Sequence, residues 1–106
     1  MISFDDFKKM ELKVARIAEV KEHPSADKLY ILEVEIAGEK KQIIAGVKEH
    51  YTPEELTGKN IAVVTNLEPA TIRGVESSGM MLAASDGSTM SILVLDRDMP
   101  TGSTIK

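Results

Sequence analysis

The sequence contains no cysteine and no tryptophan, and only four of its 106 residues are aromatic. Without cysteine, the chain can have no disulfide, no thiol nucleophile and no zinc–thiolate site. The aromatic residues are Phe4, Phe7, Tyr30 and Tyr51, so the core must be largely aliphatic. Stacking of single-stranded nucleic acid on aromatic side chains has few candidate residues for the same reason.

Long apolar runs are also missing. No segment approaches the length needed to cross a membrane, and the first residues, MISFDD, lack the features of a signal peptide. We therefore expect a cytoplasmic protein with no membrane partner. The length of 106 residues predicts that residues 1–106 form one small domain.

The net charge of −4 argues against a general nucleic-acid-binding surface. Most of the cations lie in the first half of the chain, where residues 1–53 contain 9 Lys and Arg against 4 in residues 54–106. A local basic face could therefore exist on an acidic protein. Such a face would bind nucleic acid modestly and lose affinity as the salt concentration rises.

The spacing of apolar residues predicts mainly strands. Residues 28–36 alternate between apolar and polar side chains, which predicts a strand buried on one face. Residues 12–21 predict another strand, and a break in its alternation predicts a β-bulge near Ala15 and Arg16. Ala37-Gly38-Glu39 predicts a hairpin turn into a strand over 41–45, residues 60–67 a buried strand, and residues 78–84 and 90–95 a second hairpin.

Two short helical segments are also predicted. Ser3 followed by Asp6 is typical of a helix N-cap, so we expect a helix near 3–9 whose phenylalanines are buried against the core or a partner chain. Thr52 followed by Pro53 predicts one helical turn. At least five strands, with a short helix between the third and the fourth, are typical of an all-β, five-stranded OB-fold barrel.

Two short runs combine cations with small polar residues at a turn. The first is HPSADKL, residues 23–29, and the second is RGVESSGMM, residues 73–81. Such a turn offers a positive charge to phosphate, hydroxyl groups to ribose and an apolar methionine surface to a base. This combination suits the binding of folded RNA better than it suits catalysis.

The sequence contains no convincing motif for catalysis or for metal binding. His23, Ser25 and Asp27 are the residue types of a hydrolytic triad, but five residues of one tight loop cannot easily align nucleophile, base and orienting carboxylate. His23 and His50 lack a clear third ligand for a metal ion. We therefore expect no catalytic residue, no metal site and no cofactor in this chain.

Taken with its motifs, the sequence resembles the tRNA-binding domain family. The resemblance lies in LKVARI (12–17), HPSADKL (23–29), IIAGV (43–47), Asn66-Leu67, and Arg73-Gly74 with Ser77 and Met80. The family occurs at the C-terminus of methionyl-tRNA synthetase, as a free-standing tRNA-binding protein, and in a cofactor of the multisynthetase complex. The acidic segment 51–56 and the absence of a cytokine-type C-terminal extension favour the first two branches.

The resemblance implies an OB fold that binds tRNA by its shape near the elbow, without anticodon specificity. It also implies a homodimer and an association with a methionyl-tRNA synthetase, whose catalytic region would carry out aminoacylation. The alternative is a dimeric export chaperone of a related OB family. A chaperone of that kind would bind unfolded protein through an exposed apolar groove.

For the RNA site, the resemblance implies contacts from Arg73, Ser77 and Met80, with Asn66 beside them and Lys28 after the first turn. Spacing alone adds three candidate phosphate contacts on the barrel face, which are Lys13, Arg16 and Lys41.

Three points stay open at this level. Either Ser77 or Ser78 could face the RNA, and one of Met80 and Met81 is expected in the core with the other exposed. Asn66 could equally hydrogen-bond the backbone of a turn.

Overall fold

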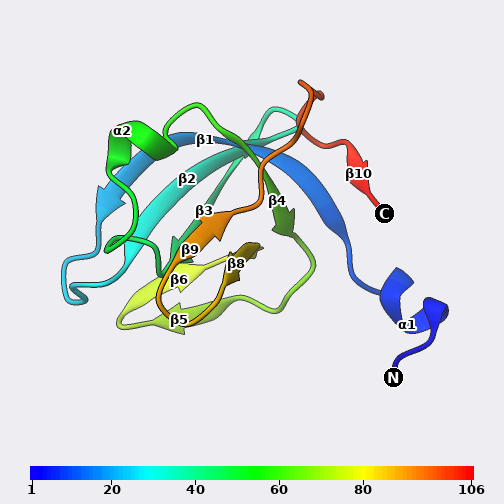
Figure 1. Cartoon of the computed structure of the whole chain (residues 1–106), viewed down its shortest axis with the longest axis horizontal. Coiled ribbons are helices and arrows are strands. Elements are labelled where there is room, and N and C mark those ends of the chain that lie inside the picture. Colours follow the sequence, from blue (N-terminus) through cyan, green and yellow to red (C-terminus); the bar gives the residue numbers. More distant parts are fainter.

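The computed structural model describes residues 1–106 and consists mainly of strands (Figure 1). Two short helices, α1 (Phe4–Lys8) and α2 (Pro53–Leu56), accompany ten strands. The strands are β1 (Leu12–Glu22), β2 (Tyr30–Ile36), β3 (Glu39–Ala45), β4 (Asn60–Val64), β5 (Ala70–Ile72), β6 (Val75–Ser77), β7 (Met80–Met81), β8 (Ala83–Ser85), β9 (Met90–Ile92) and β10 (Thr104–Ile105).

The main sheet is antiparallel and has the strand order β3-β2-β1-β4-β7, with β10 paired to the start of β1. It curls into a half-barrel, and the hairpins β5–β6 and β8–β9 lie beside its open side (Figure 1). Helix α2 lies between the third and the fourth strand. The predicted all-β, OB-like architecture is therefore confirmed.

Strand β2 follows the predicted alternation. Its apolar side chains at Tyr30, Leu32, Val34 and Ile36 are buried, while the residues between them are half-buried. The predicted hairpin follows directly, because Ala37 and the next residue have φ of 52° and 86°, the left-handed pair of a two-residue turn. This turn aligns β2 with β3 along their full length.

The β-bulge of strand β1 lies at a different position from the predicted one. The irregularity lies between Ile17 and Glu19, rather than near Ala15 and Arg16. The apparent break in the alternation has another cause, because the start of β1 is buried on both faces. Val14 is buried although its neighbour Ala15 belongs to the inner core, and the backbone of Val14 bonds Gly102 and Ser103 of the C-terminal segment.

The other predicted helices and strands are present in the structure, and mainly their first and last residues differ from the prediction. Helix α1 begins after Ser3, whose side chain accepts a hydrogen bond from the Asp6 amide, and α2 begins after Thr52 with a complete capping box. Strand β4 ends at Val64, three residues earlier than predicted. No residue of α1 is buried, and Phe4 is 72% exposed. The aromatic face of α1 is therefore not covered by the core.

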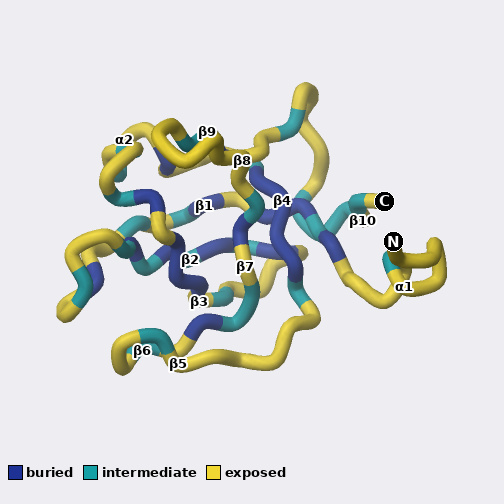
Figure 2. The backbone as a smooth tube through the Cα atoms, turned by 60° about the horizontal axis from the view of Figure 1, so that its bottom comes forward, coloured by how far each residue is buried: buried dark blue, intermediate teal, exposed yellow.

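The core fills the inside of the half-barrel and is aliphatic, as the composition requires. Its fully buried members come from β1, β2, β3, α2 and β4 and include Ile17, Leu32, Ile43, Leu56 and Ile61. Figure 2 shows the buried residues concentrated in the main sheet, while α1 and much of the β5–β6 hairpin are exposed. Neither helix has the length and apolar character needed to traverse a lipid bilayer.

Candidate nucleic-acid interface

The two motifs identified in the sequence meet at one end of the barrel, where the 23–29 loop lies against the turn between β5 and β6 (Figure 1). The Nη2 group of Arg73 donates to the backbone oxygen of Ser25 at 2.8 Å. The hydroxyl of Ser25 donates in return to the backbone oxygen of Arg73 at 3.0 Å. These bonds join residues 48 positions apart in the chain.

His23 adds a third connection between the same segments. Its ring is only 5% exposed, and its Nδ1 accepts a hydrogen bond from the Ser25 amide at 3.1 Å. Because Nδ1 accepts, the ring proton is on Nε2, which donates to the backbone oxygen of Ile72 at 3.0 Å. We call the contacts from His23 and Ser25 to Ile72 and Arg73 the clasp. Ser25 directs its hydroxyl to Arg73 rather than to His23, so no hydrolytic triad is present.

Arg73 has an unusual backbone conformation. Its φ of 53° and the φ of 87° at Gly74 form a two-residue hairpin turn of the type that favours Asn-Gly. A left-handed conformation costs a residue other than glycine about 1–2 kcal/mol. Strained residues of this kind concentrate at functional sites, where neighbouring contacts hold them in place.

Arg73 and Lys28 lie on the two segments that the clasp joins, and neither forms a salt bridge. Arg16, Lys40 and Lys48 are paired with carboxylates, while Lys13 and Lys41 are not. Asp27 is exposed in the 23–29 loop and reduces the net charge of this corner. The positive field is therefore local, and it matches a small number of phosphate contacts rather than a broad electrostatic surface.

Lys13 and Lys41 lie away from the clasp. Lys41 pairs with Val34, which is roughly 13 Å along β2 from Tyr30 at 3.3 Å per residue, and Lys13 pairs with Val63 and Thr104 near the start of β1. Lys13 donates from Nζ to the hydroxyl of Thr104 at 3.2 Å. Both lysines line a shallow hollow of about 280 Å³ together with Glu11 and Glu39. The carboxylates balance the two lysines, so this hollow is not strongly cationic.

Arg16 lies on the outer face of the sheet, where its Nε is 4.0 Å from a carboxylate oxygen of Glu35. Hydrogen bonds from the Thr101 hydroxyl and the Gly38 amide, with a smaller contribution from Arg16, hold the pKa of Glu35 below its ordinary value. Glu35 thus remains a carboxylate partner for Arg16.

Asn66 is turned toward the N-terminal segment. Its Nδ2 donates to the backbone oxygen of Lys9 at 2.7 Å, and its Oδ1 accepts from the Glu11 amide at 2.8 Å. This is the backbone-bonding role that the sequence left open.

Ser77, implied by the resemblance as an RNA contact, has its hydroxyl bonded inside the protein. It is 4% exposed, accepts from the Ile44 amide at 3.0 Å and donates to the backbone oxygen of Gly79 at 3.1 Å. Its hydroxyl thus links β3 to the chain after β6 and helps to close the barrel. Ser78 is half-buried and is the more accessible serine of the pair.

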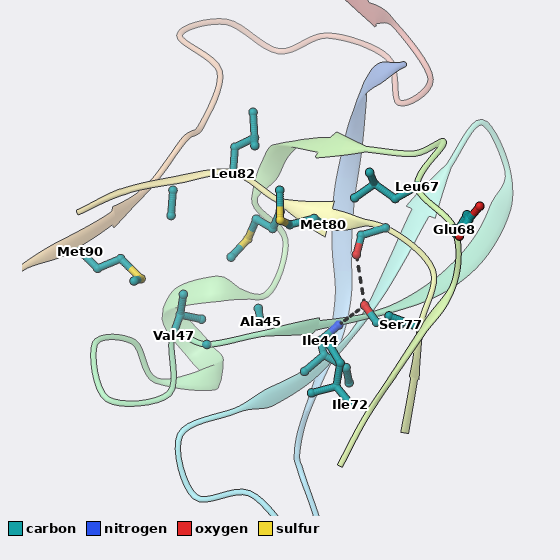
Figure 3. A pocket seen from close by; sticks show the side chains of 15 residues that line it. Ile44, Ala45, Val47, Leu67, Glu68, Ile72, Ser77, Met80, Leu82 and Met90 are labelled. Atoms are coloured by element: carbon teal, nitrogen blue, oxygen red, sulfur yellow. Dashed lines mark hydrogen bonds between the residues drawn. The ribbon is translucent and has the colours of Figure 1, made fainter. Parts of the chain in front are cut away.

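The two methionines divide as expected, because Met81 is 8% exposed and packs in the core while Met80 is 48% exposed. Met80 lies over an apolar groove of about 500 Å³ between the end of β3 and β7. Figure 3 shows Leu67 and Met80 on one side of the groove, opposite Ile44 and Val47. The sequence did not predict this groove. Its only sign there is the run Met80-Met81-Leu82, in which consecutive residues are apolar where a strand buried on one face would alternate.

Comparison with known proteins agrees with these features. Residues 12–104 match the family described as "Putative tRNA binding domain". The chain is 46% identical over 105 residues to the methionine–tRNA ligase of Thermococcus kodakarensis and 54% identical over 105 residues to that of Methanococcus aeolicus. Each alignment covers 99% of this chain, and the chain spans only 14% and 16% of the length of these two relatives.

Solved structures support the same assignment. The crystal structure of a MetRS related protein from Pyrococcus horikoshii matches with a TM-score of 0.93 and 29% identity, over 100% of this chain and 98% of that chain. Chaperone CsaA from Bacillus anthracis matches with a TM-score of 0.90 and 26% identity, over 100% and 99% of the two chains. Because the family match extends over residues 12–104, the chain belongs to the tRNA-binding domain family.

Proposed function

We propose that this chain is a non-catalytic module that binds folded tRNA by its shape near the elbow. The observation that supports this most directly is the clasp, which brings Arg73 and Lys28 onto adjoining turns with no salt-bridge partner. On a domain of net charge −4, cations that no carboxylate neutralises can still supply a local site for phosphate. Membership of the tRNA-binding domain family gives the nature of the ligand.

The contacts within this site can be divided by chemistry. Arg73 and Lys28 bind phosphate oxygens, Ser78 offers a hydroxyl to ribose, and the exposed thioether of Met80 packs against a base or sugar face. Lys13 and Lys41 are weaker backbone contacts away from the clasp. Contacts to backbone rather than to base edges carry no sequence information, which agrees with recognition of the fold common to all tRNAs.

The module serves a larger enzyme in this proposal. The chain covers about one-seventh of the related methionine–tRNA ligases, so aminoacylation belongs to the remaining part of those proteins. A module with modest affinity raises the effective concentration of tRNA near an attached or associated synthetase without adding chemistry. Modest affinity also permits release of the charged tRNA.

We further propose that the module forms a homodimer through the end of the molecule where the two termini lie (Figures 1 and 2). Large apolar side chains without a covering are frequent in the terminal segments, where Ile2 is 73%, Phe4 72% and Met99 48% exposed. The aromatic side of α1 is not covered by the core, so it is available to a partner chain. Light scattering across micromolar concentrations should give the mass of a dimer, and Phe4→Ser should shift it toward a monomer. A wild-type monomer throughout this range would exclude the dimer.

A binding experiment with several tRNAs tests the main proposal. Arg73→Ala should weaken binding of initiator, elongator and unrelated tRNAs by the same factor, because a shape contact is common to all of them. Arg97→Ala is the matched control, since Arg97 is exposed and sits beside Asp96 in a loop. A loss confined to one tRNA would contradict shape recognition.

The apolar groove favours one second candidate, a chaperone that binds unfolded protein. Its lining is mostly apolar and includes the exposed Met80, and chaperone CsaA shares the fold over the full length of this chain. Suppression of aggregation of a denatured client protein, with no binding of tRNA, would favour this function over the first.

A further inference from the structure

We infer that His23 and Ser25 are positioning residues that hold the Arg73–Gly74 turn, and the Arg73 guanidinium, in the orientation that binds RNA. This inference rests on the proposed tRNA-binding function. Neither residue contacts the RNA in this inference. Both hold Arg73, which makes the contact, in position.

The first argument is the weak attachment of the β5–β6 hairpin. The hairpin forms a separate two-stranded sheet with only three residue pairs, and no ladder joins it to the main sheet. Two-stranded hairpins of this size are at best marginally stable without further support. Bonds to β3 hold the base of the hairpin, so the tip with its turn needs a separate attachment.

The hairpin is tied at both of its ends. At its base, the Gln42 side chain donates to the backbone oxygen of Glu76 at 2.8 Å, and the Ser78 amide donates to the backbone oxygen of Gln42 at 2.9 Å. At its tip, the clasp holds the backbone oxygens of Ile72 and Arg73. The tip is where the strained Arg73 lies, so the clasp determines the position of that residue.

The second argument is the buried state of His23. His23 is 5% exposed and is one of two buried polar residues in the chain, the other being Ser77. Both nitrogens of the His23 ring bond backbone groups, one on its own loop and one on β5. The imidazole therefore connects the 23–29 loop to the hairpin through both of its nitrogens.

The third argument concerns the guanidinium of Arg73. One of its five N–H groups is used by the Ser25 oxygen, and the side chain remains exposed. The remaining donors are free for a phosphate. A side chain that is ordered before binding loses less conformational freedom when the ligand arrives, so the clasp increases affinity by preorganisation.

The test is a double-mutant experiment with intact tRNA at one fixed salt concentration. Ser25→Ala and His23→Phe are each measured in the wild-type chain and in an Arg73→Ala background. Ser25→Thr serves as the conservative variant that retains the hydroxyl, and Ser91→Ala is the control because Ser91 is exposed and its hydroxyl has no partner. Thermal unfolding is recorded for every variant.

We expect Ser25→Ala to weaken binding about 3- to 10-fold, the worth of one hydrogen bond, with little change in the unfolding midpoint. Ser25→Thr should restore the affinity, and Ser91→Ala should leave it unchanged. In the Arg73→Ala background, Ser25→Ala and His23→Phe should have no further effect, because there is no guanidinium left to position.

The outcomes separate this inference from the proposed function. If Arg73→Ala binds tRNA as the wild type does, the proposed site is wrong. If Arg73→Ala weakens binding but Ser25→Ala does not, the site stands and the clasp has no positioning role. If Ser25→Ala weakens binding equally in both backgrounds, Ser25 acts by a route other than Arg73, and the inference is overturned. Should His23→Phe fail to fold, the Ser25 variants decide the question alone.

Discussion

The substitution Arg73→Asn should separate tRNA binding from stability. Asn-Gly is the favoured pair in a two-residue turn of this type, and Arg73 has a φ of 53° in it. Replacing arginine by asparagine should relieve about 1 kcal/mol of left-handed strain. It also removes the hydrogen bond from Nη2 to Ser25, which contributes about 1.5 kcal/mol, the lower end of the range for a charged group, because the bond is exposed to water.

These two effects oppose each other, so the free energy of unfolding should change by less than about 1 kcal/mol. The affinity for tRNA gains nothing from the relief of backbone strain, so the loss of the guanidinium is not offset. A hydrogen bond to a charged group contributes about 1.5–3 kcal/mol, and its loss corresponds to roughly a 10- to 150-fold rise in the Kd for tRNA. The slope of binding against salt should also fall by about one phosphate contact.

Urea unfolding and a tRNA titration on the same preparation measure both quantities. Arg97→Asn is the matched control, because it makes the same chemical change at another exposed arginine and should alter neither quantity much. An Arg73→Asn variant that keeps wild-type affinity would refute the proposed site. A variant that loses affinity only in proportion to its loss of folded protein would refute the separation of function from stability.

Three further substitutions test the structure around the site. Ser77→Ala leaves the buried amide of Ile44 without a partner and should lower the free energy of unfolding by about 1–3 kcal/mol in urea, against a small change for Ser91→Ala. Gly79→Ala should cost about 2 kcal/mol or more by the same measurement, since φ is 140° and a Cβ would lie 2.9 Å from a backbone oxygen. The pKa of Glu35 is lowered in the folded state, chiefly by the Thr101 hydroxyl, so its stabilisation is full above the ordinary value of 4.5 and is lost as the pH falls through the depressed pKa. Glu35→Gln should therefore reduce the loss of stability on acidification, and an acid-unfolding curve identical to that of the wild type would contradict this.

Local patterns in the sequence predicted much of the fold. The alternation in β2, the left-handed turn at Ala37 and the capping sequence at Thr52 each depend on neighbours within a few residues, and the structure has all three. The bulge was placed wrongly because both Val14 and Ala15 are buried, in a part of β1 whose backbone pairs with the far end of the chain. A periodicity cannot show which distant segment covers a strand.

In the candidate site, too, features set by neighbouring residues were predicted and contacts between distant segments were not. Both motifs were identified in the sequence, but their contact across 48 residues was not, because it depends on how the barrel brings the two turns together. The family resemblance implied RNA contacts from Ser77, within the second motif, and from Asn66 before it. In the structure, the Ser77 hydroxyl bonds Ile44, and the Asn66 amide bonds Lys9 and Glu11. These partners are distant in the sequence, so the internal bonds could not be predicted from it.

The most direct test of tRNA recognition by shape is a competition titration. Labelled tRNA bound to this domain is displaced by unlabelled intact tRNA, an anticodon stem-loop, duplex RNA and single-stranded RNA at one moderate salt concentration. We predict that intact tRNAs of any identity compete equally and that the three fragments do not. Equal competition by all RNAs, or by none, would contradict recognition of the tRNA elbow through the Arg73 corner.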